Sequence, residues 1–70
     1  MQINEFKAEV VRKGMTLDDI ATKTGMNRTT LWRRLNNPDG FTLKEIKHLK
    51  YALDLNGQRV LEIFFDPEVS

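Results

Sequence analysis

The sequence predicts an all-α domain of five short helices. Apolar residues recur at spacings of three and four along successive segments, and residues typical of helix starts and ends separate those segments. No stretch alternates between apolar and polar side chains as a half-buried strand would. The 70 residues are 40% apolar and 30% charged, a composition typical of one folded domain spanning residues 1–70.

The first two helices have clear end signals. The first is expected to end at Gly14, since glycine readily adopts the left-handed conformation that terminates a helix. The second is expected between Thr16, which with Asp19 resembles a capping box, and Gly25. The apolar positions at helical spacing are Ile3, Phe6, Val10 and Val11 in the first helix, and Leu17, Ile20 and Ala21 in the second.

The third helix is expected over residues 28–36. Asn27 is a good N-cap for it, because its side chain can accept a hydrogen bond from an otherwise unpaired backbone amide. Only two residues separate Gly25 from this helix, so the second and third helices must cross steeply. Residues 37–40, around Pro38, all favour a turn and form the only expected linker.

Two further helices complete the expected fold. Thr42 and Glu45 form a second capping box at the start of the fourth helix. Asn56 is expected to cap the fifth helix, and Asp66 with Pro67 to close it. The side of the fourth helix that is expected to face inward carries Leu43, Ile46, Leu49 and Leu53.

Composition argues against several classes of protein. There is no cysteine, and the apolar runs are too short for a signal-peptide core or a membrane span. His48 lacks the neighbours of a catalytic or metal site and is expected to be solvated, while Asp18 and Asp19 suit charge compensation at a helix start. We therefore expect a cytoplasmic protein that is no enzyme and binds no metal, cofactor, small-molecule substrate or membrane.

The net charge of +1 conceals an uneven distribution. Residues 20–50 hold seven basic residues against two acidic ones, whereas the rest of the chain holds four against eight. Such asymmetry indicates a surface that meets a polyanion, the alternative being a set of solvated helix faces. Residues 20–38 contain four basic side chains and no carboxylate, which favours the polyanion, because solvated helices usually mix charges.

The outward face of the expected third helix carries groups suited to reading bases. At roughly 100° per residue, Leu31 and Leu35 mark the buried stripe, and Thr29 and Arg33 fall on the opposite side. Arginine can donate two parallel hydrogen bonds to guanine, and threonine offers a hydroxyl and a methyl group to thymine. Trp32, on the flank, can contact a sugar or a thymine methyl group, or equally cover the edge of the core.

Residues 17–36, LDDIATKTGMNRTTLWRRLN, resemble the helix-turn-helix of the phage repressor and Cro-like family. The likeness includes the small Ala21, which lets two helices approach, and Gly25 at the turn, and it extends through residues 41–46 to residues 63–65. The matching core positions are Ile20, Met26 and Leu31. The resemblance implies a five-helix, lambda-repressor-like DNA-binding domain with its helix-turn-helix at the second and third helices.

The resemblance also implies residue roles. Arg28, Thr29 and Arg33 would face bases, while Asn36 and the helix start near Thr16 would touch phosphate. Donors and positive charge at the rim can supply further phosphate contacts. The expected DNA-binding residues are Thr16, Asn27, Arg28, Thr29, Thr30, Trp32, Arg33, Arg34, Asn36 and Lys44.

Three positions depart from the family's pattern. Leu17 stands where members often place a glutamine that grips phosphate, and Asp39 where related chains often have a basic residue. Thr24 replaces a commonly apolar residue, so its hydroxyl must find a backbone partner.

The last helix has an apolar arc of about 200°, wider than one buried stripe requires. The arc is formed by Val60, Leu61, Ile63, Phe64 and Phe65. It predicts a homodimer through this segment, which the resemblance allows; the alternative is that these side chains finish the core of the monomer. A two-fold dimer would require a near-palindromic operator in double-stranded DNA.

The resulting hypothesis is a sequence-specific regulator of transcription that binds double-stranded DNA, a phage or prophage repressor or Cro-like protein. Its recognition helix, residues 28–36, would enter the major groove. The alternative is the same fold used as a protein-interaction module, for instance as an antitoxin or an adaptor. The two hypotheses differ in how strongly binding responds to salt.

Overall fold

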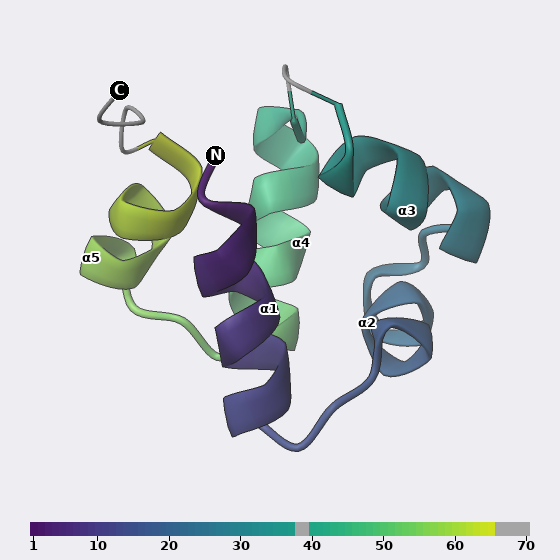
Figure 1. Cartoon of the computed structure of the whole chain (residues 1–70), viewed down its shortest axis with the longest axis horizontal. Coiled ribbons are helices and arrows are strands. Elements are labelled where there is room, and N and C mark those ends of the chain that lie inside the picture. The colour runs from purple at the N-terminus through teal and green to yellow at the C-terminus, as the bar shows by residue number, and fades with distance from the viewer. Residues whose placement is uncertain (38–39, 66–70) are drawn as a thin grey trace.

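The chain is all-helical over the residues described by the computed structural model, which are 1–37 and 40–65. The helices are α1 (Ile3–Arg12), α2 (Leu17–Thr24), α3 (Arg28–Leu35), α4 (Leu43–Ala52) and α5 (Gly57–Val60), which continues as a π-helical turn, η1 (Leu61–Phe65) (Figure 1). No strand occurs in the described ranges, so the predicted all-α class with five helices is confirmed. No helix within them is long and apolar enough to cross a membrane.

The helix starts are those that the sequence predicts. The hydroxyl groups of Thr16 and Thr42 accept hydrogen bonds from the amides of Asp19 and Glu45, each at 3.2 Å. The two carboxylates accept in return from the threonine amides at 2.8 Å, which completes both capping boxes. Asn56 caps α5 through its side-chain oxygen. The expected closure of this last helix by Asp66 and Pro67 lies outside the described residues, as do Pro38 and Asp39 of the expected linker.

The connection between α2 and α3 is short and tightly bonded. Gly25 ends α2 with a φ of 74°, in the left-handed region that glycine adopts without strain. The side-chain oxygen of Asn27 then accepts the amide of Thr29 at 2.7 Å and so starts α3. In Figure 1, α2 is seen nearly end-on and α3 from the side, so their axes are steeply inclined, as expected.

Thr24 finds the backbone partners that its burial requires. Its hydroxyl donates to the carbonyl oxygen of Ile20 at 2.8 Å and accepts from the amide of Met26 at 3.3 Å. The polar side chain therefore links the last turn of α2 to the residue that follows Gly25, and it helps to fix the approach of α3. α2 also packs against α4, so the α2–α3 pair is held from behind.

Three phenylalanine rings form the centre of the core. Phe6 of α1, Phe41 just before α4 and Phe64 of η1 contact one another pairwise, with ring centroids 6.0 to 6.1 Å apart. The amide of Gln2 donates to the carbonyl oxygen of Ile63 at 2.7 Å, which joins the start of the chain to η1. The other apolar core residues are Val10, Ile20, Ala21, Leu31, Leu35, Ile46, Leu49, Leu53, Leu55, Val60 and Ile63.

Two apolar residues that recur at the predicted helical spacing do not face inward. Val11 and Leu43 are exposed to 77% and 74%. Val11 lies one step of roughly 100° beyond Val10, outside the side of α1 that meets the core, and the inward position next to Val10 is filled by Glu9 instead. Leu43 is the first residue of α4 and precedes the turns that pack on the core.

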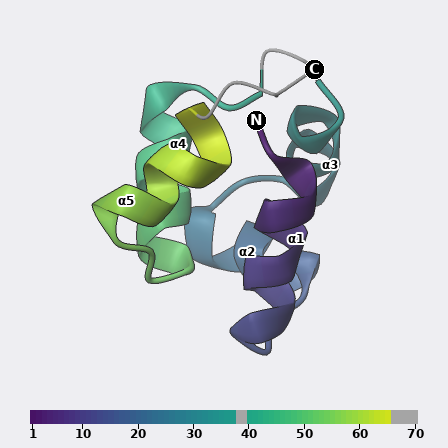
Figure 2. The same ribbon diagram turned by 60° about the vertical axis from the view of Figure 1, so that its left-hand side comes forward.

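The apolar arc of the last helix is divided between core and surface. Val60, Ile63 and Phe64 are buried, while Leu61 and Phe65 remain 55% and 50% exposed. The two views place α5 and η1 on one side of the molecule and α3 on the other (Figures 1 and 2). The alternative in which this segment completes the monomer core is therefore correct for three of its five apolar residues.

Candidate nucleic-acid interface

The outward face of α3 is polar, basic and open. Leu31 and Leu35 are buried, as the helical wheel predicts, whereas Thr29 and Arg33 on the opposite side are exposed. Trp32 is 55% exposed and is not part of the core, so the indole presents a large apolar surface to solvent. Trp32 therefore does not mainly cover the edge of the core, which was the alternative expectation for this side chain.

These outward side chains surround one shallow depression. It is lined by Thr29, Trp32, Arg33, Asn36 and Asn37. Asn37, which directly follows the expected helix, was not among the predicted site residues. The depression thus combines an aromatic surface with a hydroxyl, a guanidinium and two amides. These groups can form hydrogen bonds and apolar contacts with base edges and sugars.

The three arginines of α3 differ in their partners. A carboxylate oxygen of Asp18 accepts a hydrogen bond from Nη1 of Arg28, and Nε of Arg34 lies 3.2 Å from the carboxylate of Glu45. Within residues 1–37 and 40–65, Arg33 makes no ion pair or side-chain hydrogen bond. The same holds for the exposed Lys44. Arg33 therefore offers a guanidinium that pairs with none of the described carboxylates.

Residues 20–38 contain no carboxylate, but this does not mean that every arginine of the α3 face is unpaired. The acids that pair with Arg28 and Arg34 come from just outside that window, from the start of α2 and the start of α4. The spacing of these residues in the sequence does not reveal the two pairs, because side chains ten and eleven positions apart meet only when the helices pack. None of these four side chains lines the depression.

The start of α2 is already occupied by an anion of its own chain. The amide of Thr16 donates to Asp19, and this hydrogen bond lowers the pKa of Asp19 below its ordinary value, so the carboxylate stays ionised. A phosphate at this helix start would compete with that carboxylate. Thr16 itself is exposed, as the expected role requires.

The remaining predicted residues shape the ends of α3. Asn27 is exposed, but its side-chain oxygen is engaged in capping. The side-chain amide of Asn36 donates to the carbonyl oxygen of Trp32 at 2.8 Å, which helps to end the helix at Leu35 rather than at Asn36. Thr30 is half-buried on the flank. The hydrogen bonds of the Asn27 and Asn36 side chains thus hold these two residues at the two ends of α3.

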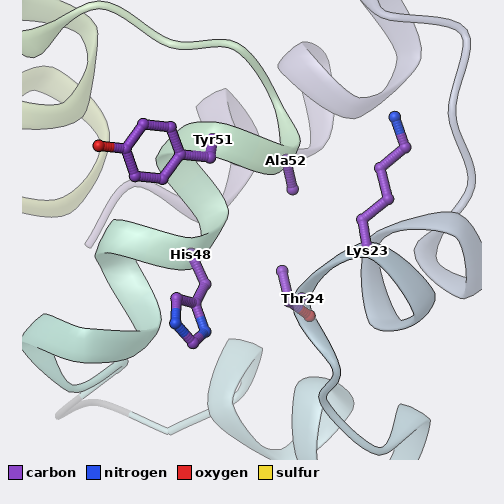
Figure 3. Close-up of a pocket in the computed structure, with 5 residues that line it drawn as sticks. All are labelled: Lys23, Thr24, His48, Tyr51 and Ala52. Atoms are coloured by element: carbon purple, nitrogen blue, oxygen red, sulfur yellow. The ribbon is translucent and has the colours of Figure 1, made fainter.

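A second depression lies between α2 and α4 (Figure 3). It is lined by Lys23, Thr24, His48, Tyr51 and Ala52. His48 is exposed here, as expected for a solvated helix residue. Among the described residues no three side chains of the metal-ligating kinds lie together.

The comparisons with known proteins give no relative. No protein-family model, curated protein or solved structure matches the chain. Its function is therefore inferred from the residues of the α3 face and from the pattern of residues 17–36.

Proposed function

We propose that the chain is a sequence-specific regulator of transcription that binds double-stranded DNA, of the phage repressor and Cro-like class. In this proposal α2 and α3 form a lambda-repressor-like helix-turn-helix, and α3 is the recognition helix in the major groove. A cytoplasmic location accompanies this function. The observation that carries the proposal is the outward face of α3, where Arg33 lies between Thr29 and Asn36 without an acidic partner among the described residues.

The proposal gives different roles to different side chains. Thr29 and Arg33 face base edges, joined by Arg28 at the start of the helix. The exposed Lys44 contacts phosphate at the rim. Arg34 contributes less positive charge than its type suggests, because Glu45 neutralises it.

The chain acts on DNA as a homodimer that is joined through η1. The exposed pair Leu61 and Phe65, one helical turn apart, supports this arrangement. Because η1 and α3 lie on opposite sides of the protomer, such a dimer leaves both recognition helices uncovered (Figures 1 and 2). Two recognition helices in successive major grooves, roughly 34 Å apart, would read a near-palindromic operator.

The proposal is tested by selecting duplexes from a random pool and measuring their affinity against salt concentration. We expect a preferred near-palindrome and a log–log salt slope of roughly 0.9 for each phosphate contacted. Arg33→Ala should reduce the preference at one base-pair position of each half-site by about tenfold. Lys44→Ala, the matched control, should weaken all duplexes alike and lower the slope by about one.

Two results would count against these assignments. Equal losses from Arg33→Ala and Lys44→Ala on selected and random duplexes would contradict the division into base and phosphate contacts. A chain that selects no duplex, and whose binding partner responds weakly to salt, would favour the protein-interaction module, such as an antitoxin or adaptor, over DNA binding.

A further inference from the structure

The two arginines that the proposed function directs toward bases are held differently. Arg28, the first residue of α3, is bound by Asp18, which lies ten positions earlier in the first turn of α2. Arg33, further along α3, has no such partner in the described part of the chain. One guanidinium is therefore tethered at the α2–α3 junction, whereas the other has no ion-pair partner among the described residues.

The ion pair between Asp18 and Arg28 contributes little to the stability of the fold. The two side chains are 74% and 52% exposed, and ion pairs this open to solvent contribute little to folding. The capping box of α2 is completed by Asp19, so Asp18 is not needed to start the helix. The pair nevertheless lies at the edge of the face that the proposed function places against DNA.

We infer that Asp18 is a specificity-determining residue that positions Arg28 and withholds its charge from phosphates. This inference rests on the proposed function. A free arginine at a helix end can reach several phosphates and adds affinity for any sequence. An arginine whose charge is neutralised by a neighbouring carboxylate releases fewer counterions, so its contribution to sequence-independent binding falls.

Tethering also favours contact with one base. Guanidinium has five N–H donors, and Asp18 engages one nitrogen, Nη1, which leaves donors on Nε and Nη2 for a base edge. Since the side chain is already ordered, it loses less conformational freedom when it binds. The carboxylate of Asp18 also repels phosphate from the start of α3, which disfavours binding positions in which Arg28 would meet a phosphate instead of a base. Asp18 thus lowers affinity for random DNA and sharpens the choice of sequence.

The test compares Asp18→Asn with Asp19→Asn on the selected duplex and on a scrambled one. Both substitutions remove one negative charge from the first turn of α2, and asparagine at position 19 can still accept from the amide of Thr16. Asp18→Asn should raise affinity for scrambled DNA, steepen the salt slope by up to about 0.9, and lower the ratio of specific to random affinity about tenfold. Asp19→Asn should raise both affinities alike and leave the ratio unchanged.

Two further measurements isolate the contact itself. In an Arg28→Ala background, Asp18→Asn should no longer change the ratio, since its partner is gone. In the free protein, NMR of the guanidinium groups should show slower rotation for Arg28 than for Arg33, and Asp18→Asn should abolish the difference. Circular dichroism confirms that each variant is folded.

The outcomes separate this inference from the function on which it rests. If the wild-type chain prefers one duplex but Asp18→Asn and Asp19→Asn change the ratio equally, Asp18 acts only through general charge and the inference is overturned alone. The same conclusion follows if the Arg28→Ala background still responds to Asp18→Asn. A wild-type chain without any sequence preference overturns the proposed function and this inference together.

Discussion

Glu9 and Arg59 lie fifty positions apart in the sequence and in direct contact in the fold. Nε of Arg59 is 2.7 Å from a carboxylate oxygen of the buried Glu9. The same guanidinium lies 2.7 Å from Glu5 and 3.3 Å from Glu62, and Arg12 also bonds Glu9. Hydrogen bonds to Glu5 and Glu9 raise the pKa of Arg59, so its charge is permanent. This cluster joins α1 to α5 and compensates the one carboxylate that α1 turns inward.

We expect Arg59→Met to lower the free energy of unfolding by about 2 kcal/mol, because Glu9 would keep a single partner in a buried position. Methionine retains most of the aliphatic packing, so the loss reports the charge. Urea unfolding at neutral pH measures it. Glu62→Gln, which removes an exposed partner of the same arginine, should cost less than about 0.5 kcal/mol. Equal effects of the two substitutions would contradict the role of Arg59 in compensating the charge of the buried Glu9.

At the level of the helices, the start of α4 combines two functions in one carboxylate. Glu45 accepts the amide of Thr42 at 2.8 Å and also lies 3.2 Å from Nε of Arg34 on α3. Partial burial alone would raise the pKa of Glu45, but the Thr42 amide and the charge of Arg34 outweigh it and lower the pKa. The residue that caps α4 thereby also fixes α4 to the end of the recognition helix.

The lowered pKa makes this contribution dependent on pH. A carboxyl group whose pKa is lower in the folded than in the unfolded state stabilises the fold above its unfolded pKa of about 4.3, and this effect is lost as pH falls through the folded value. Glu45→Ala should cost about 1 kcal/mol at pH 7. The difference from wild type should shrink as pH falls below about 4, measured by urea unfolding.

Glu45→Gln is the matched control for that measurement. Glutamine can still accept the amide of Thr42, as in other capping boxes, but it does not carry the charge that attracts Arg34. It should therefore retain part of the stability at pH 7, with the remaining loss again vanishing in acid. A difference between Glu45→Ala and wild type that is constant from pH 7 to pH 3 would contradict the role of the ionised carboxylate.

At the scale of the molecule, the positions of η1 and α3 matter most for the proposed dimer. The protomer measures 32 × 22 × 20 Å, so its longest dimension is close to the roughly 34 Å between successive major grooves on one side of DNA. A dimer joined through η1 can place one recognition helix in each groove only if both protomers incline toward the same side of the DNA. The apolar surface left on η1 consists of Leu61 and Phe65, a small area for a stable dimer. DNA that holds both protomers would add to its stability.

We expect the double substitution Leu61→Lys with Phe65→Lys to abolish dimerisation and weaken binding to the near-palindrome at least tenfold, without unfolding the chain. Both side chains are half exposed, so the core is largely spared. Sedimentation with and without operator DNA measures the assembly. Val11→Lys changes another exposed apolar residue, in the last turn of α1, and should leave the dimer intact. A wild-type chain that stays monomeric on DNA would exclude this arrangement.

Much of this architecture follows from local signals. The capping boxes at Thr16 and Thr42, the left-handed turn at Gly25 and the cap at Asn27 depend on residues within four positions of one another, so sequence alone predicts where the helices begin and how α2 meets α3. The buried stripe of α3 follows from its period, and with it the exposure of Arg33 and Thr29. The exposure of Val11 also follows from the helical period, since it lies about 100° beyond Val10. The exposure of Leu43 could not be read in this way, because it depends on which turns of α4 pack on the core.

The sequence by itself determined the helices, their caps and the basic outward face of α3, since each depends on short-range hydrogen bonds or on the period of one helix. Only the tertiary structure decided which charges remain available on that face. Asp18 and Glu45 neutralise Arg28 and Arg34 across gaps of ten and eleven positions, and Arg59 finds Glu9 across fifty. Coulomb attraction depends on distance in space, and that distance is set only when the helices pack.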